Sequence, residues 1–185
     1  MNCTNCKDGF LKPEKIDDLF PAHTCDSCGG NWILIEEYAI WKANNPDHVF
    51  SSHSTTQEFK SPEPKKALIC PVSGSIMQKF RITSNSEHKI NYSAKVGGIW
   101  LDKGEWDYLK SEGLAGSLNT VLTEHKQNEI MQDTAKEHFS EIYQDRFGKE
   151  AYQKIIEIRE WLDKHEQKQD LLAYLVAEDP YSANR

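Results

Sequence analysis

Four cysteines near the start of the chain have the residue type and the spacing of a metal site. Cys3 and Cys6 form one C-x-x-C pair, Cys25 and Cys28 form a second, and 18 residues separate the pairs. Two such pairs at this separation are typical of a tetrahedral zinc site with four thiolate ligands. Four cysteines also fill the coordination sphere and leave no position for a catalytic water. We therefore predict one structural Zn²⁺ per chain, held by these four residues.

Two glycines and a tryptophan follow the second pair directly. Because glycine accepts positive φ angles and close backbone contacts, we expect Gly29 and Gly30 to bring the backbone near the sulfurs. Trp32 and Ile33 are then expected to begin a strand or to cover the site.

The same stretch recurs later in the chain without its cysteines. Gly97-Gly98-Ile99-Trp100 repeats the spacing of Gly29-Gly30-Asn31-Trp32. The positions that align with the four cysteines hold Cys70, Ser73, Ser93 and Val96. Because one thiol and two hydroxyls are a poor ligand set for zinc, we expect this second unit to fold by packing, without metal. Cys70 is then a remnant that packs as a small hydrophobe; a redox or metal-capturing thiol is the alternative.

Other residues suggest chemistry less strongly. Asp102 and Glu105 fit a pair of carboxylates for acid–base catalysis, but their spacing also fits a capping box at a helix start, which we favour. The histidines share no metal-binding spacing, and no phosphate-binding loop, nucleophile elbow or dinucleotide-binding turn occurs. We therefore predict that the protein is not an enzyme.

Aromatic and basic residues leave nucleic-acid binding as an alternative. Trp32 and Trp100 have the flat rings that stack on bases, but their equivalent positions favour a role in the core of each unit. Lys79, Arg81 and Lys89 form a basic patch if adjacent strands bring them to one face. A solvated sheet face is the interpretation that we favour.

Composition and charge restrict the partners and the compartment. The net charge of the 185 residues is -7, and residues 113–185 carry 9 basic and 14 acidic side chains, so no segment binds phosphates by charge alone. No apolar run approaches the roughly 20 residues of a membrane span. The N-terminus lacks the pattern of a signal peptide, so we expect a cytoplasmic protein with reduced cysteines.

The pattern along the chain predicts an α+β protein of two small β units and a helical C-terminal domain. We expect a zinc ribbon over residues 1–44, a linker over 45–66, a metal-free ribbon over 67–112 and a helical hairpin or bundle over 113–185. Apolar residues at intervals of three and four predict a long helix over about 117–147, ending before Gly148. This helix is also where a homodimer could form.

The two motifs together resemble the transcription-factor-IIB-type zinc ribbon domains of small bacterial proteins. The first unit shares the four cysteines, the glycine pair and Trp32, and the second shares a longer set of residues: Cys70, Pro71, Gly97, Gly98, Trp100, Leu101, Asp102, Gly104 and Glu105. The resemblance covers about residues 1–110 and implies zinc in the first unit. It implies two tandem ribbons, the second without three of its four ligands.

These observations favour a non-enzymatic adaptor or regulatory protein. We expect it to act through protein–protein contacts, with another protein as partner. The alternative is a transcription-associated ribbon that binds nucleic acid, as the family name suggests. No membrane partner is expected.

Overall fold

The computed structural model describes residues 1–51 and 67–181, and it confirms the predicted α+β class. Three strands and a helix come first: β1 (Leu11–Ile16), β2 (Phe20–Cys25), β3 (Asn31–Leu34) and α1 (Ile35–Asn44). The same succession then recurs as β4 (Gln78–Arg81), β5 (Lys89–Ser93), β6 (Gly98–Leu101) and α2 (Glu105–Ser111). Of the predicted linker, residues 52–66 lie outside the described residues, whereas Phe50 packs on Trp41 and Trp106.

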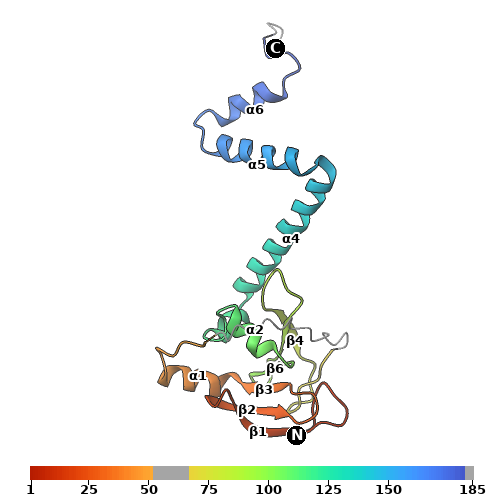
Figure 1. The fold of residues 1–185 in the computed structure, drawn as a ribbon, viewed down its shortest axis with the longest axis vertical. Helices are drawn as coiled ribbons and strands as arrows, with labels where there is room; N and C mark the ends of the chain where they lie inside the picture. The colour runs from red at the N-terminus through yellow and green to blue at the C-terminus, as the bar shows by residue number, and fades with distance from the viewer. Residues whose placement is uncertain (52–66, 182–185) are drawn as a thin grey trace. The chain divides into compact units, whose positions relative to one another are not determined.

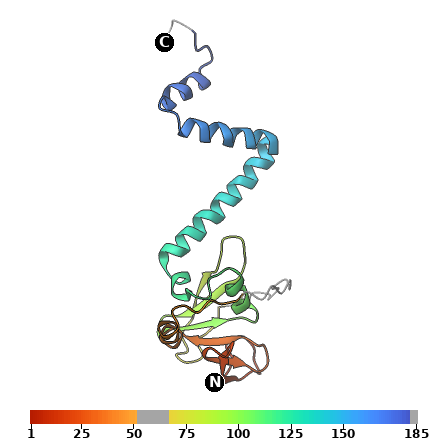
Figure 2. The ribbon, with the colours of Figure 1, turned by 60° about the vertical axis from the view of Figure 1, so that its left-hand side comes forward.

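All six strands form one antiparallel sheet in the order β1-β2-β3-β6-β5-β4. Strands β3 and β6 lie side by side at its centre, as Figures 1 and 2 show, and Trp32 is paired directly with Trp100. The two predicted units therefore share a continuous sheet. That they arose as tandem repeats, with the boundaries predicted above, stays a prediction.

Each face of this sheet has its own apolar cluster, because neighbouring residues of a strand point to opposite faces. On one face, α1 and α2 contribute Tyr38 and Trp106, which pack around Phe20 with ring centroids 5.4 and 5.5 Å away. On the other face, Trp32 and Trp100 are buried among a second group of residues: Leu11, Cys25, Leu68, Cys70 and Met77. The prediction that both tryptophans belong to the core is confirmed.

The helices that follow are α3 (Leu118–Val121), α4 (Glu124–Phe147), α5 (Lys149–Asp163) and α6 (Lys168–Val176). The long helix predicted over 117–147 is interrupted, because the hydroxyl of Thr123 accepts the N–H of Lys126 and caps a new helix. Gly148, with φ of 80°, ends α4 as predicted. The chain divides into two compact units, Met1–Thr134 and Ala135–Arg185, and no described helix is long and apolar enough to cross a membrane.

Candidate metal centre

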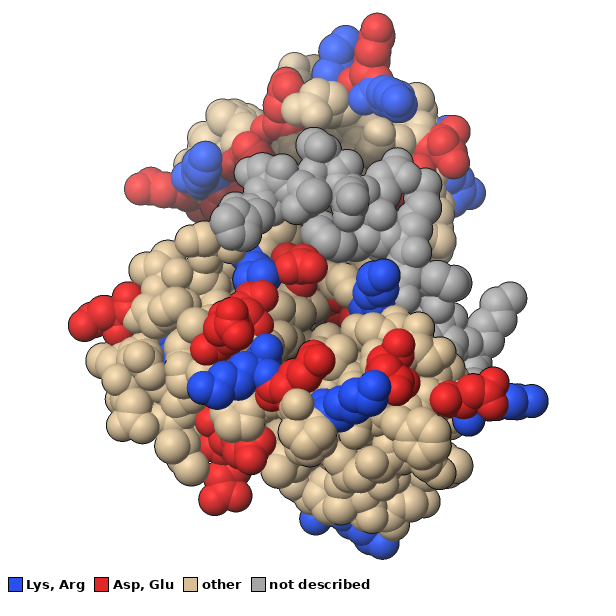
Figure 3. Space-filling view, turned by 60° about the horizontal axis from the view of Figure 1, so that its bottom comes forward, with Lys and Arg blue, Asp and Glu red and all other residues tan. Residues whose placement is uncertain are grey.

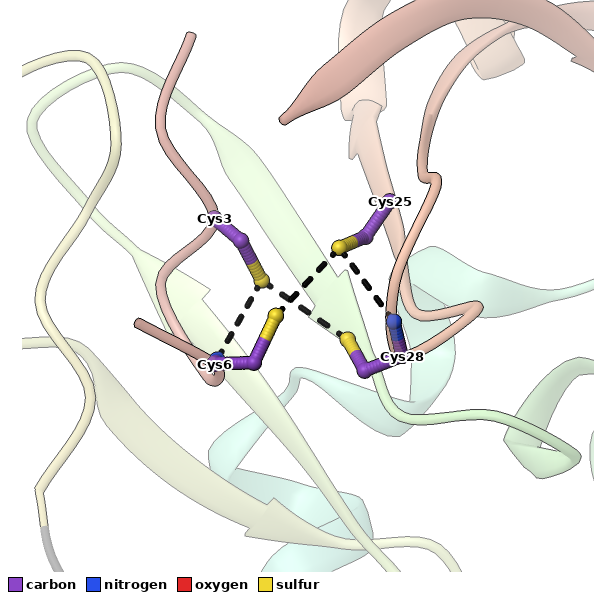
Figure 4. Close-up of side chains that lie close together, drawn as sticks. All are labelled: Cys3, Cys6, Cys25 and Cys28. Carbon is purple, nitrogen blue, oxygen red and sulfur yellow. Dashed lines mark hydrogen bonds between the residues drawn. The ribbon is translucent and has the colours of Figure 1, made fainter. Parts of the chain in front are cut away.

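The four predicted ligands meet in one cluster. Their sulfurs all lie within 4.8 Å of one another, with 3.7 Å between Cys3 and Cys28 and 3.5 Å between Cys6 and Cys25 (Figure 4). A tetrahedral ion with Zn–S bonds of about 2.3 Å has sulfurs roughly 3.8 Å apart. The cluster therefore has the dimensions of a four-thiolate zinc site, and no similar group of three or more ligands occurs elsewhere in residues 1–51 and 67–181.

Backbone turns hold each pair of cysteines in place. The N–H groups of Asn5 and Cys6 donate to Cys3 Sγ at 3.3 and 3.4 Å, and the N–H of Cys28 donates to Cys25 Sγ at 3.5 Å. Such bonds stabilise negative charge on sulfur. Gly29 has the expected positive φ, 69°, and its N–H donates to the carbonyl of Cys25.

One glycine leaves room for two of the sulfurs, and the spacing of the cysteines did not predict it. A β-carbon on Gly9 would lie 2.4 Å from Cys25 Sγ and 2.5 Å from Cys6 Sγ. A β-carbon on Gly30 would instead meet the ring of Trp100 at 2.3 Å. The N–H of Gly30 bonds to the Cys28 sulfur, so its backbone approaches the site as expected, while its Cα faces the other half of the sheet. The sequence signal that could have identified Gly9 is its position shortly after the first cysteine pair.

Protonation of the thiols differs within the cluster. Burial raises the pKa of Cys3 to about 11 and raises the pKa of Cys28 further. Burial acts in the same direction on Cys25, but N–H groups from Cys28 and Ser27 outweigh it and lower the pKa of Cys25 to about 7. Because zinc binds thiolates, metal binding at neutral pH releases protons from this cluster.

The aligned positions of the second half keep the turn but not the ligands. Ser73 N–H donates to Cys70 Sγ at 3.3 Å, and Gly74, with φ of 68°, donates to the Cys70 carbonyl, as Gly29 does to Cys25. Cys70 and Ser93 are buried. Burial acts to raise the pKa of the Cys70 thiol, but the hydroxyls of Ser73 and Ser93 outweigh it and lower that pKa. The packed position of Cys70 fits the structural interpretation.

Asp102 and Glu105 are both buried and are joined by a hydrogen bond of the kind found in a capping box. Glu105 accepts the N–H of Asp102 at 2.7 Å, as the glutamate of a capping box does. The other half of that prediction is wrong, because Gly104 is the N-cap residue and the Asp102 side chain does not cap α2. It accepts instead from Trp100 Nε1 at 2.8 Å and from Asn5 Nδ2 at 2.9 Å, so it joins the first zinc turn to the second half of the sheet.

Strand pairing also decides where the basic residues lie. Arg81 is paired directly with Lys89 across β4 and β5, and Lys79 lies two residues from Arg81, so the three share one face. Glu87 lies 3.6 Å from Arg81 and 3.9 Å from Lys89 and neutralises part of this patch. The condition for a basic patch is therefore met, with an acidic residue among the basic ones.

Comparisons with known proteins agree with the metal centre. The family model described as transcription factor zinc-finger, the TFIIB-type zinc ribbon, matches residues 2–44. No curated protein and no solved structure matches the chain. Residues 2–44 are thus similar to a TFIIB-type zinc ribbon, whose four-cysteine cluster binds one Zn²⁺ per chain.

Proposed function

We propose that the protein is a zinc-stabilised, non-enzymatic adaptor that acts through protein–protein contacts in the reducing cytoplasm. The observation that carries this proposal is the closed set of four thiolates, which holds the ion without an open position for water or substrate. A reducing compartment keeps such thiolates available as ligands.

The residues between the ligands support a role for the ion inside the fold. Thr4 donates its hydroxyl to the carbonyl of Ile69, and Asn5 donates to the Asp102 carboxylate. Both bonds run from the turn between Cys3 and Cys6 to segments that flank strands β4 to β6. The ion then stabilises both halves of the sheet, and the folded sheet presents its surfaces to a partner protein.

Removal of zinc tests this role. Structural zinc contributes on the order of 10–16 kcal/mol in small sites, which is comparable to the roughly 5–15 kcal/mol stability of a whole domain. Chelation should therefore expose backbone amides of β2 and of β6 to hydrogen exchange together, while α5 and α6 keep their exchange rates. Loss of protection in β1 and β2 alone would contradict the proposed scaffold role of the ion.

The alternative function is nucleic-acid binding by the basic patch of Lys79, Arg81 and Lys89. Two observations favour this alternative: the three residues share one face, and the family model that matches residues 2–44 is described as a transcription factor zinc-finger. The ion pairs of Glu87 with Arg81 and Lys89 disfavour it. On the face of the molecule shown in Figure 3, basic and acidic side chains are also interspersed rather than separated by sign.

Fluorescence anisotropy with labelled duplex DNA, single-stranded DNA and RNA separates the two functions. The zinc-loaded protein is titrated at about 50 mM salt and again at about 200 mM salt. Contacts to phosphates are strongly weakened at the higher concentration. An adaptor shows no binding at either concentration. Micromolar binding that falls with salt, and that Arg81→Ala weakens while the exposed control Lys12→Ala does not, would replace the adaptor by the nucleic-acid alternative.

A further inference from the structure

The helical unit has almost no core of its own. Among its described residues, 135–181, Leu162 is the one buried side chain. The same residues hold twelve of the twenty exposed large hydrophobic side chains in the described part of the chain. Because a segment of this size cannot bury enough apolar surface alone, the exposed face of this unit needs a partner.

Helix α4 presents a continuous apolar stripe within this unit. Phe139, Ile142, Tyr143 and Phe147 are spaced at three and four residues, so they share one side of the helix. Their exposed fractions are 55, 42, 41 and 46%. The rings of Phe139, Tyr143 and Phe147 stack in order, with centroids 6.5 and 5.6 Å apart. The stripe is therefore ordered before any partner arrives, which reduces the entropy cost of docking.

Helix α5 extends this surface beyond the bend at Gly148. Tyr152 stacks on Tyr143 with a centroid distance of 6.4 Å, and Ile155 and Ile158 are 42 and 48% exposed. An open hollow of about 730 Å³ lies at the bend, lined by residues of both helices that include Gln144, Tyr152 and Ile156. The surface therefore combines a projecting stripe with a concave corner.

We propose that this surface docks a second copy of the same chain, through α4 and α5 of each protomer. Seven exposed large apolar side chains lie on these helices within the unit. Four of the seven are aromatic side chains, which bury about 150–250 Å² each, and three are smaller isoleucines, so the seven half-exposed side chains offer roughly 600 Å² per chain. Two copies would bury roughly 1,200 Å², which reaches the lower end of the roughly 1,200–2,000 Å² of a stable interface.

The charges on the two helices suit a second copy better than a strongly charged partner. Residues 135–147 carry two basic and three acidic side chains, and α5 carries three basic and four acidic ones. Neither helix presents a field of one sign that would select a highly acidic or basic molecule. In a two-fold pairing the same surface of each copy meets its counterpart, because an isologous interface uses one patch twice.

This inference rests on the proposed adaptor function and names its first partner. Sedimentation equilibrium of the zinc-loaded full chain, from about 1 to 100 µM, should give twice the chain mass of 21.3 kDa at the upper concentrations. A mass of one chain at about 100 µM would overturn the inference and leave the adaptor with a different protein as partner. Nucleic-acid binding in the anisotropy experiment would overturn the adaptor function and leave this mass unchanged.

A pair of matched variants locates the interface. Phe139→Gln/Ile142→Gln places two amides on the stripe, and Glu141→Gln/Asp145→Asn places two amides at exposed positions on other sides of the same turns. The first variant should shift the association constant at least tenfold toward the monomer, whereas the second should remain dimeric. A zinc content of one ion per chain verifies that the sheet is folded in each variant. A dimer that both variants preserve equally would refute docking through this stripe.

Discussion

Trp100 packs so closely on Gly30 that a β-carbon at Gly30 would lie 2.3 Å from Cζ2 of the indole. The reciprocal contact exists between Trp32 and Gly98, where the distance would be 2.1 Å. Each half of the sheet therefore supplies a glycine that makes room for the tryptophan of the other half. Because β3 and β6 are antiparallel neighbours, the glycine of each Gly-x-Trp motif lies diagonally across from the tryptophan of the other motif.

Gly30→Ala should destabilise the first compact unit by about 1–3 kcal/mol, the usual cost of overpacking a core. Thermal or urea unfolding of the zinc-loaded protein measures the loss. Gly113→Ala is the matched control, because nothing lies within 4 Å of its β-carbon and only its φ of 69° opposes the change. Equal losses in the two variants would show that the tryptophan contact contributes nothing.

Gly9→Ala should weaken zinc binding with little direct effect on the sheet. Its β-carbon would lie 2.4 Å from Cys25 Sγ, so the sulfurs must move from their tetrahedral positions. We expect at least a tenfold loss in affinity, similar to the effect of changing residues that orient the ligands at other metal sites. Competition with a chromophoric chelator measures it. Gly74→Ala, at the turn beside Cys70, should leave zinc affinity unchanged.

The bond from Asn5 to Asp102 should couple the zinc turn to the second half of the sheet. Asn5→Ala removes one of the donors to a buried carboxylate, and hydrogen bonds to charged groups contribute about 1.5–3 kcal/mol. A double-mutant cycle with Asp102→Ala measures this energy from urea unfolding. Asn2→Ala, an exposed asparagine outside the ligand pair, is the control. Additive effects of Asn5→Ala and Asp102→Ala would disprove the coupling.

Glu105 should make stability depend on pH. Burial raises the pKa of Glu105, and this effect outweighs the lowering by His88 and by the N–H of Asp102. A carboxyl group whose pKa is higher in the folded state than in the unfolded state stabilises the folded state. This stabilisation is fully present at pH values below the unfolded pKa of about 4.3. That contribution is lost as pH rises through the folded pKa. The free energy of unfolding of the wild type, relative to Glu105→Gln, should therefore fall as pH rises above about 4.3 and through the folded pKa of Glu105.

The comparison between wild type and Glu105→Gln is made at saturating zinc, so that protonation of the cysteines affects both proteins equally. Glu112→Gln, at an exposed position after α2, should show no change of this difference with pH. A wild-type advantage that grows with pH would contradict the assignment.

The sequence alone predicted the parts that depend on short spacing. Two cysteines three positions apart meet on one turn, so Cys3, Cys6, Cys25 and Cys28 were identifiable as ligands. The end of α4 before Gly148 and the backward reach of Glu105 to the N–H of Asp102 also depend on neighbouring residues. Local backbone geometry determines each of these features, whatever the rest of the chain does.

Only the tertiary structure decided which distant residues meet. Three contacts join segments that are far apart in the chain. They are the pairing of β3 with β6, the packing of Trp32 on Gly98 and of Trp100 on Gly30, and the bond from Asn5 to Asp102. The position of Gly9 between two sulfurs likewise required both cysteine pairs to be in place. These contacts depend on strand register and on packing between halves, which local spacing does not encode. The zinc ligands were therefore determined by sequence, whereas the connection of the zinc site to the whole sheet was determined by the fold.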